Sequence, residues 1–283
     1  LEIVKKAGPD DLVVCMISGG GSALLALPGP GLTLEDKQSI SKALLRSGAT
    51  ISEMNCVRKH LSAIKGGRLA QASSPARMVT YLVSDVPGDD PAIIASGPTV
   101  ADPTTGKDAL DILRHYQIDI PTAAKDLLTN STHETVKPGD ACFDGHETVM
   151  LARPQDSLEA AAKIARDLGL NPVILGDAIE GEAREVAIMH AGIAHQVANH
   201  GQPAAKPCVL LSGGETTVTV RGKGGRGGRN SEFLLSLLIQ FRDQSGLSAL
   251  AIDTDGIDGS EDNAGAIIDP TSWLKGQDAG IDL

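Results

Sequence analysis

The sequence has almost no aromatic residues, no Cys-x-x-Cys pair and no excess of basic side chains. Aromatic residues make up 2% of its 283 positions, so the core must be built from Leu, Ile, Val and Ala. The formal net charge of −11 argues against a nucleic-acid or anionic-membrane binder, because both need a basic face. Four widely separated cysteines indicate reduced thiols of a cytoplasmic protein, and no apolar run approaches the ~18 residues of a membrane span.

The common nucleotide-binding signatures are also missing. A Walker A loop needs Gly-Lys followed by Ser or Thr, and neither Gly-Lys pair, at 106–107 and 222–223, continues in that way. A dinucleotide fingerprint needs three spaced glycines. Gly19 and Gly21 fit the first two positions, but Leu24 stands at the third. Any nucleotide site in this chain must therefore use a different loop.

Short apolar runs alternate along the chain with helix-like stretches, and each run ends in Gly, Ser or Asp. This alternation predicts an α/β fold, with a Rossmann-like, mainly parallel sheet domain followed by a smaller mixed α/β domain. We place the first domain at residues 1–204 and the second at 205–283, with a linker over 201–207. Strands are expected at 12–17, 78–83, 147–152, 172–175, 209–211 and 248–252, with a hairpin-like segment at 216–220.

Ligands of such sheets bind outside the carboxyl ends of the strands. The first of these ends carries a glycine-rich turn, made of Ser18, Gly19, Gly20, Gly21 and Ser22. Its backbone N–H groups can approach a phosphate closely, and a helix that starts there adds a positive dipole. The alternative is a plain tight turn, but three consecutive glycines exceed what a turn needs, so we expect an anion-binding loop.

Acidic residues follow two other predicted strands. Asp85 follows one strand directly, with Asp89 and Asp90 close behind, and Asp255 follows another. Carboxylates in these places can hold Mg²⁺ or orient a substrate hydroxyl, although Asp and Gly also form ordinary solvated turns. The string after residue 253 is not a calcium loop, because Ile257 occupies a ligand position.

Basic residues gather in two places despite the negative net charge. Arg58 and Lys65 belong to the first group, and the Gly/Arg loop 222–230 contains the second. In that loop the guanidinium of Arg229, followed by Asn230, is suited to carboxylate or phosphate oxygens. A flexible nucleic-acid-binding tail is the alternative, which the acidic composition disfavours.

Eight ordered segments together resemble the class II glycerate 2-kinases, and they cover nearly the whole chain. They are the segments at 17–24, 55–62, 64–67, 84–89, 95–99, 211–217, 227–230 and 253–259. The resemblance implies a Rossmann-like domain and a smaller domain with the Gly/Arg loop, with an active site in the cleft between them. It also places Asp85, Glu215, Arg229 and Asp255 at active-site positions of the family.

The sequence departs from this family at both ends. The family's N-terminal Gly-Lys-Ala motif, taken to hold a catalytic lysine, has no counterpart, and neither does its C-terminal Gly/Thr/Asn-rich motif. We therefore expect a fragment trimmed at both ends, which leaves its full activity open.

The resemblance and the residues lead to one functional hypothesis, ATP-dependent phosphorylation of glycerate at its 2-hydroxyl. The 18–22 loop would hold the ATP phosphates. Arg229, Asn230, Arg58 and Lys65 would bind the anionic substrate, with Asp85 or Asp255 on the hydroxyl or on Mg²⁺. Two alternatives remain, an NAD(P)H-dependent hydroxypyruvate reductase, a label that some family members carry, and a non-catalytic nucleotide-binding module. A homodimer is possible.

Overall fold

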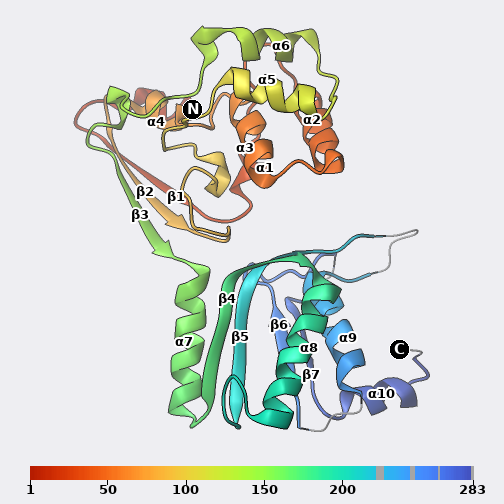
Figure 1. Ribbon diagram of the computed structural model, residues 1–283. Helices are drawn as coiled ribbons and strands as arrows, with labels where there is room; N and C mark the ends of the chain where they lie inside the picture. The colour runs from red at the N-terminus through yellow and green to blue at the C-terminus, as the bar shows by residue number, and fades with distance from the viewer. Residues whose placement is uncertain (221–225, 243–245, 261, 282–283) are drawn as a thin grey trace. The chain divides into compact units, whose positions relative to one another are not determined.

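The structure is a computed structural model that describes residues 1–220, 226–242, 246–260 and 262–281. The chain forms two compact units, Leu1–Arg153 and Pro154–Leu283, which are described separately below. Both are mixed α/β units with parallel strand pairs, as the sequence predicted (Figure 1). The division falls after Arg153, whereas the sequence placed it at residue 204.

The sheet of unit 1 has three parallel strands in the order β1-β2-β3. They are β1 (Leu12–Ile17), β2 (Arg77–Val83) and β3 (Glu147–Ala152). Leu12 pairs with Arg77 and Ile17 with Leu82, so β1 and β2 end side by side. The loops that follow these two strands therefore leave the same edge of the sheet.

Several helices lie between the strands of unit 1 along the chain (Figure 1). They are α1 (Gly21–Leu24), α2 (Leu34–Ser47), α3 (Ile51–His60), α4 (Arg68–Ser73), α5 (Gly106–His115) and α6 (Thr122–Thr129). Reciprocal capping boxes fix the starts of α2, α3 and α5, where Thr33, Thr50 and Thr105 each pair with the acidic residue three positions later. Each such cap stabilises its helix by about 1 kcal/mol.

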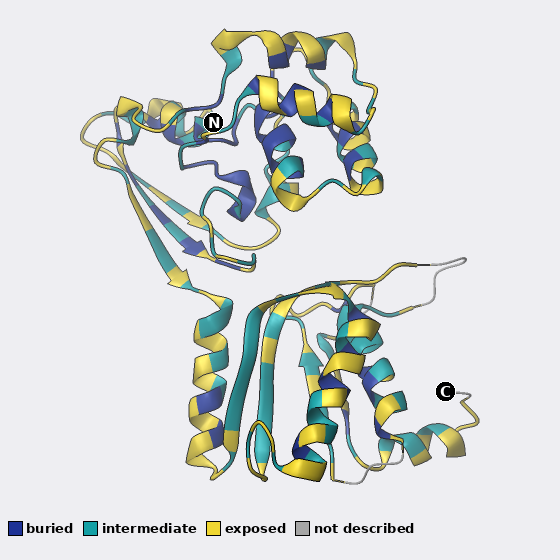
Figure 2. Ribbon diagram, viewed as in Figure 1, coloured by how far each residue is buried: buried dark blue, intermediate teal, exposed yellow. Residues whose placement is uncertain are grey.

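The helices of unit 1 enclose an aliphatic core (Figure 2). Leu44, Val57, Leu113 and Leu127 from α2, α3, α5 and α6 lie in it with at most 6% of their surface exposed. No aromatic side chain belongs to this described cluster. In unit 1 the core is thus free of aromatic side chains as composition predicted, whereas the buried cluster of unit 2 includes Phe241.

Unit 2 begins with α7 and contains two separate two-stranded sheets. Its elements are α7 (Pro154–Asp167), β4 (Asn171–Glu182), α8 (Ala183–His200), β5 (Cys208–Thr217), α9 (Arg229–Phe241), β6 (Ala249–Ile252), β7 (Gly265–Ile268) and α10 (Ser272–Asp278). β4 and β5 are parallel, and β6 and β7 are antiparallel. α8 and α9 pack on each other, and Ala187, Ala191, Leu234 and Leu237 are buried between them and the strands.

The pairing of β4 with β5 explains two differences from the sequence-based expectation. Asn171 pairs with Cys208 and Glu182 with Thr217, so residues on both sides of the expected 204/205 boundary share one sheet. The hairpin expected over 216–220 is absent from its described residues, because Thr216 and Thr217 continue β5 and pair with β4. A long-range strand pairing therefore places residues 171–182 and 208–217 in the same compact unit.

None of the described helices has the length and apolar character needed to cross a bilayer. All four cysteines are free, but only Cys56 is buried, while Cys15, Cys142 and Cys208 are partly exposed.

Candidate functional site

The glycine-rich loop of unit 1 lies where β1 ends, as the sequence predicted. Ser18, Gly19 and Gly20 are exposed, and Gly20 has a φ of 78°, which favours glycine. The helix that follows, α1, has only four residues. A helix of one turn supplies little dipole, so the positive field expected at this loop must come from elsewhere.

Asp85 lies against the glycine loop. It follows β2 after the buried Ser84, and a Cβ atom placed on Gly19 would overlap its carboxylate. A larger residue at position 19 would therefore displace that carboxylate. The structure thus brings together two features that the sequence predicted separately, the loop and the acidic residue of the neighbouring strand.

Lys65 supplies positive charge to the same loop. Its Nζ donates to the carbonyl oxygen of Ser22 at 2.6 Å and to Ser96 Oγ at 3.4 Å. The residue is 2% exposed. Burial, followed by the positive charges of Lys37 and Arg58, lowers the pKa of Lys65 to about 8.

Lys37 and Arg58 complete a group of three cations. Lys37 Nζ donates to the carbonyl oxygens of Ala26 and Leu27 at 2.9 and 3.3 Å, and burial lowers its pKa to about 8. Burial also lowers the pKa of Arg58. Within the described ranges no carboxylate forms an ion pair with any of these three side chains. Such uncompensated positive charge favours an anionic ligand.

A buried hydrogen-bond chain supports the far side of the loop. Ser22 Oγ lies 3.0 Å from Ser96 Oγ, and Ser96 Oγ donates to Asn55 Oδ1 at 3.0 Å. Ala95, Ser96 and Gly97 have φ values of 52°, 61° and 57°. Two consecutive non-glycine residues in the left-handed region are strained, a feature that clusters at functional sites.

Sequence reasoning missed Lys37, Asn55 and Ser96 as parts of this site. Asn55 and Ser96 lie in segments that resemble the family, which was the available signal, whereas Lys37 stands in a helix without any motif. Of the run at 58–60, only Arg58 joins the cation group. Lys59 Nζ lies 3.4 Å from Asp102 Oδ1, and His60 Nε2 lies 2.7 Å from Glu134 Oε1.

Unit 2 contains a second group of charged residues around Arg229, the first residue of α9. Its guanidinium donates to Glu215 of β5 and to Asp253 Oδ2 at 3.1 Å. Burial alone would lower the pKa of Arg229, but Glu215 and Asp253 outweigh it and raise the pKa. The prediction named Glu215 and missed Asp253, which directly follows β6.

Asp258 fixes the helix start that carries Arg229. Its carboxylate is fully buried and accepts hydrogen bonds from the backbone N–H groups of Asn230 and Ser231 at 2.9 and 2.8 Å. Gly228 must be glycine, since a Cβ there would overlap Asp258. The position of Arg229 therefore depends on a buried carboxylate about thirty residues later in the chain.

The other predicted residues of unit 2 have local roles in the structure. Asn230 Nδ2 lies 3.4 Å from Asp258 Oδ1, and the exposed Asp255 accepts a hydrogen bond from Ile257 N at 3.1 Å. Asp255 makes no hydrogen bond or ion pair with Arg229 among the described residues. Residues 221–225 of the Gly/Arg loop lie outside the described part of the chain.

Metal binding was predicted at Asp85 and Asp255, which belong to different units. Within the described residues no group of three or more His, Cys, Asp or Glu side chains could hold an ion. Mg²⁺ is often held by one or two carboxylates together with substrate phosphates, and Asp85 is the carboxylate beside the glycine loop.

Comparison with known proteins finds two matching families. Residues 1–129 match the domain of unknown function DUF4147, and residues 208–283 match the MOFRL family. Two Agrobacterium vitis proteins provisionally named hydroxypyruvate reductase are 57% and 55% identical, over 99% of this chain and 63% and 72% of their own lengths. A Pyrococcus horikoshii glycerate 2-kinase is 42% identical, over 100% of this chain and 64% of its own.

A solved structure agrees with these sequence matches. The crystal structure of glycerate kinase from Thermotoga maritima superposes with a TM-score of 0.85 at 38% identity, covering 99% of this chain and 66% of that chain. The chain thus spans less than two thirds of the length of several relatives that it matches.

Proposed function

We propose that this chain, which belongs to the glycerate kinase family that joins a DUF4147 domain to a MOFRL domain, takes part in ATP-dependent phosphorylation of glycerate at the 2-hydroxyl. The observation that carries the proposal is the environment of the glycine loop. Asp85 lies against Gly19 on one side, and the buried Lys65 binds the loop at Ser22 on the other. A loop with exposed N–H groups, a carboxylate and unpaired cations suits a phosphate with its counter-ion.

In this proposal the two units supply different groups to one reaction. The N–H groups of the 18–22 loop bind the phosphates of ATP, and Lys65 and Arg58 add positive charge. Arg229, with Asn230, binds the carboxylate of glycerate or the phosphoryl group in transfer, as a guanidinium fork suits either anion. Glu215 and Asp253 keep Arg229 oriented until the anion arrives.

The chemical step moves one phosphoryl group. The oxygen of the 2-hydroxyl forms a bond to the γ-phosphorus, and the bond from that phosphorus to the β–γ bridging oxygen breaks. The hydroxyl proton passes to a carboxylate, for which Asp85 and Asp255 are the candidates. When bound, Mg²⁺ neutralises charge on the phosphate oxygens, and whichever of these two carboxylates does not take the proton would hold it. We also place the reaction in the cytoplasm.

An assay for 2-phosphoglycerate tests this proposal. Enolase converts that product, and not 3-phosphoglycerate, to phosphoenolpyruvate, whose absorbance is followed after addition of ATP, Mg²⁺ and D-glycerate. Because the relatives are longer, the assay is run on residues 1–283 and on a chain completed with the flanking segments of the more similar Agrobacterium vitis relative. We expect ATP-dependent product from the completed chain, and less or none from residues 1–283.

Two results would replace the proposal with another function. The name of the Agrobacterium vitis relatives makes hydroxypyruvate reduction the second candidate, and consumption of NADH or NADPH with hydroxypyruvate would establish it. The exposed Leu24 at the third fingerprint position argues against that outcome. ATP binding without turnover in the completed chain would instead indicate a nucleotide-binding module.

A further inference from the structure

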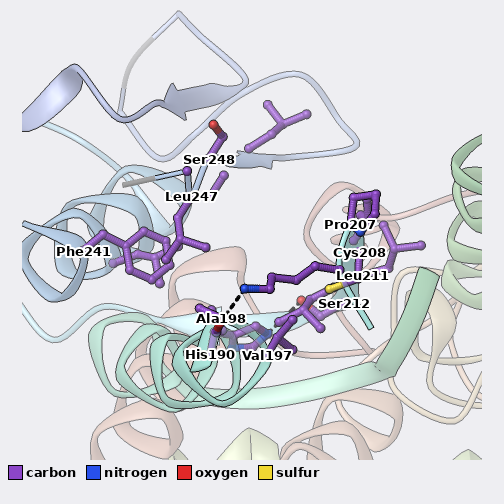
Figure 3. A pocket seen from close by; sticks show the side chains of 18 of the residues that line it. His190, Val197, Ala198, Pro207, Cys208, Leu211, Ser212, Phe241, Leu247 and Ser248 are labelled. Carbon is purple, nitrogen blue, oxygen red and sulfur yellow. Dashed lines mark hydrogen bonds between the residues drawn. The ribbon is translucent and has the colours of Figure 1, made fainter. Parts of the chain in front are cut away.

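A groove of about 760 Å³ separates the two sheets of unit 2. Residues 206–212, most of them in β5, form one wall, and residues 246–250, which lead into β6 and include its first two residues, form the other. Figure 3 shows Cys208 and Leu211 on one side, Phe241 and Leu247 on the other, and His190 and Val197 of α8 along the floor. None of these residues belongs to the site described above.

The walls of the groove are strand edges. A wall formed by consecutive residues must present backbone, because successive side chains of a strand point to opposite faces of its sheet. In the part of the chain that the structure describes, β5 is paired with β4 alone and β6 with β7 alone. The edges of β5 and β6 that face the groove therefore carry N–H and C=O groups without a strand partner, an arrangement that favours the addition of a strand.

The floor of the groove is an apolar surface on which a strand can pack. α8 and α9 pack against each other and bridge the two sheets, since α8 contacts β4 and β5 while α9 contacts β6 and β7. Val197, Phe233, Leu237 and Phe241 present apolar surface to the groove from these helices. The two helices thus cover the gap between the two sheets. Every second side chain of a strand inserted in this gap would be buried against them.

We propose that a β-strand from outside residues 1–283 of the same polypeptide fills this groove and joins β4-β5 to β6-β7 in one sheet. The length of the relatives supports this occupant over a second copy. The Thermotoga maritima structure matches 99% of this chain with only 66% of its own residues, so about a third of its length has no counterpart here. An inserted strand of five to six residues has the usual length of a strand in globular proteins.

The inserted strand has a consequence for Arg229. α9 starts at Arg229, and its residues Phe233, Leu237 and Phe241 line the groove. At the other wall, Ser212 Oγ of β5 lies 3.0 Å from His190 Nε2 of α8. Ser212 stands three residues before Glu215 in the same strand. A strand packed against both α9 and β5 would therefore restrict the movement of the two elements that carry Arg229 and Glu215. The inference goes beyond the proposed function and does not depend on it.

Amide hydrogen exchange and thiol labelling test the inference directly. Both are measured on residues 1–283 and on the chain completed with the Agrobacterium vitis flanking segments. Exchange of the amides at 209–211 and 249–251 should be at least about tenfold slower in the completed chain. Alkylation of Cys208, quantified peptide by peptide, should slow by a similar factor. Cys142 of unit 1 is the internal reference and should react at one rate in both proteins.

A pair of variants of α8 makes the test specific to the groove. Ala194 lines the groove, whereas Gln196 on the same helix is exposed. Ala194→Phe should restore fast exchange at 209–211 in the completed chain, because the larger side chain occupies the space of the strand. Gln196→Phe should leave the protection in place.

Three outcomes would overturn the proposal. Equal exchange in the short and the completed chain would mean that the groove stays open. Protection that appears in residues 1–283 with increasing concentration, together with a dimer mass, would make a second copy the occupant. Protection that survives Ala194→Phe would place the added segment elsewhere. If the completed chimera does not fold, the intact Agrobacterium vitis relative and its trimmed counterpart provide the same comparison.

Discussion

Replacing Asp258 with alanine should destabilise unit 2 more than any exposed acidic substitution in it. The Asp258 carboxylate is fully buried and accepts bonds from two backbone N–H groups of α9 and from Ser231 Oγ, which lies 2.5 Å away. Asp258→Ala leaves these donors without their acceptor at the first turn of the helix. Water cannot simply replace the carboxylate at a site that is closed to solvent.

The size of the effect follows from the bonds that are lost. Loss of an N-cap costs about 1 kcal/mol, and a hydrogen bond to a charged group contributes about 1.5–3 kcal/mol. The two figures describe partly the same bonds, so we expect a loss of about 2–3 kcal/mol in the free energy of unfolding of unit 2. With a urea dependence of about 2 kcal/mol per molar, the midpoint should fall by about 1–1.5 M.

Tryptophan fluorescence reports on this unit alone, because Trp273 is the single tryptophan of the sequence and lies in α10. Urea titrations of Asp258→Ala are compared with those of Asp262→Ala, which removes an exposed carboxylate from the same loop region. The control should unfold at the wild-type midpoint. If Asp258→Ala unfolds at the same urea concentration as Asp262→Ala, the assignment of Asp258 as the main cap of α9 is wrong.

The same carboxylate gives the prediction a pH dependence. Burial would raise the pKa of Asp258, but hydrogen bonds from Ser231 and Asn230 outweigh it and lower the pKa below its ordinary value. Its stabilisation is therefore fully present above the unfolded-state pKa of about 3.9 and is lost as the pH falls through the lower folded-state pKa. The difference between wild type and Asp258→Ala should shrink over that acidic range.

Three further predictions concern the proposed site. Gly19→Ala should weaken ATP binding, measured by calorimetric titration, at least about tenfold, because the added Cβ would displace Asp85. Gly8→Ala is the control and should leave the affinity for ATP unchanged, because the nearest atom to its added Cβ would lie 3.8 Å away. From pH 8 to pH 10 the free energy of unfolding of unit 1, followed by circular dichroism, should gain more in wild type than in Lys65→Met, since the lowered pKa of Lys65 lets the folded state release a proton that the unfolded chain keeps; an equal change in both proteins would exclude Lys65 as a source of the pH dependence. Arg229→Lys should lower turnover of the completed chain at least about a hundredfold in the enolase assay, as a single ammonium lacks the guanidinium fork; near wild-type turnover would remove Arg229 from the mechanism.

Local pattern was enough to predict much of unit 1. The run at 12–17 forms β1, and residues 147–152 form β3. These features depend on interactions within a few residues, such as turn chemistry and side-chain caps, which a sequence displays directly. The position of the glycine loop at a strand end was predictable for the same reason.

Features that depend on distant partners were not predictable in this way. Residues 171–182 pair with 208–217, on the other side of the expected 204/205 boundary, and Thr216 and Thr217 continue β5 instead of forming the expected hairpin. The sequence named Arg229 and Asp255 as site residues but not Asp253, the carboxylate of this loop that contacts the Arg229 guanidinium. Two residues of one loop differ little in pattern, and only the register of the chain decides which carboxylate faces the guanidinium.

The sequence by itself determined the alternation of strands and helices, the loop of consecutive glycines and the family to which these belong. Only the tertiary structure decided which charges are buried together. Lys37, Arg58 and Lys65 come from separate segments, and burial lowers the pKa of each because packing removes water from all three. Desolvation depends on every atom that surrounds a group, whatever its distance along the chain, and for that reason it cannot be read from residue order.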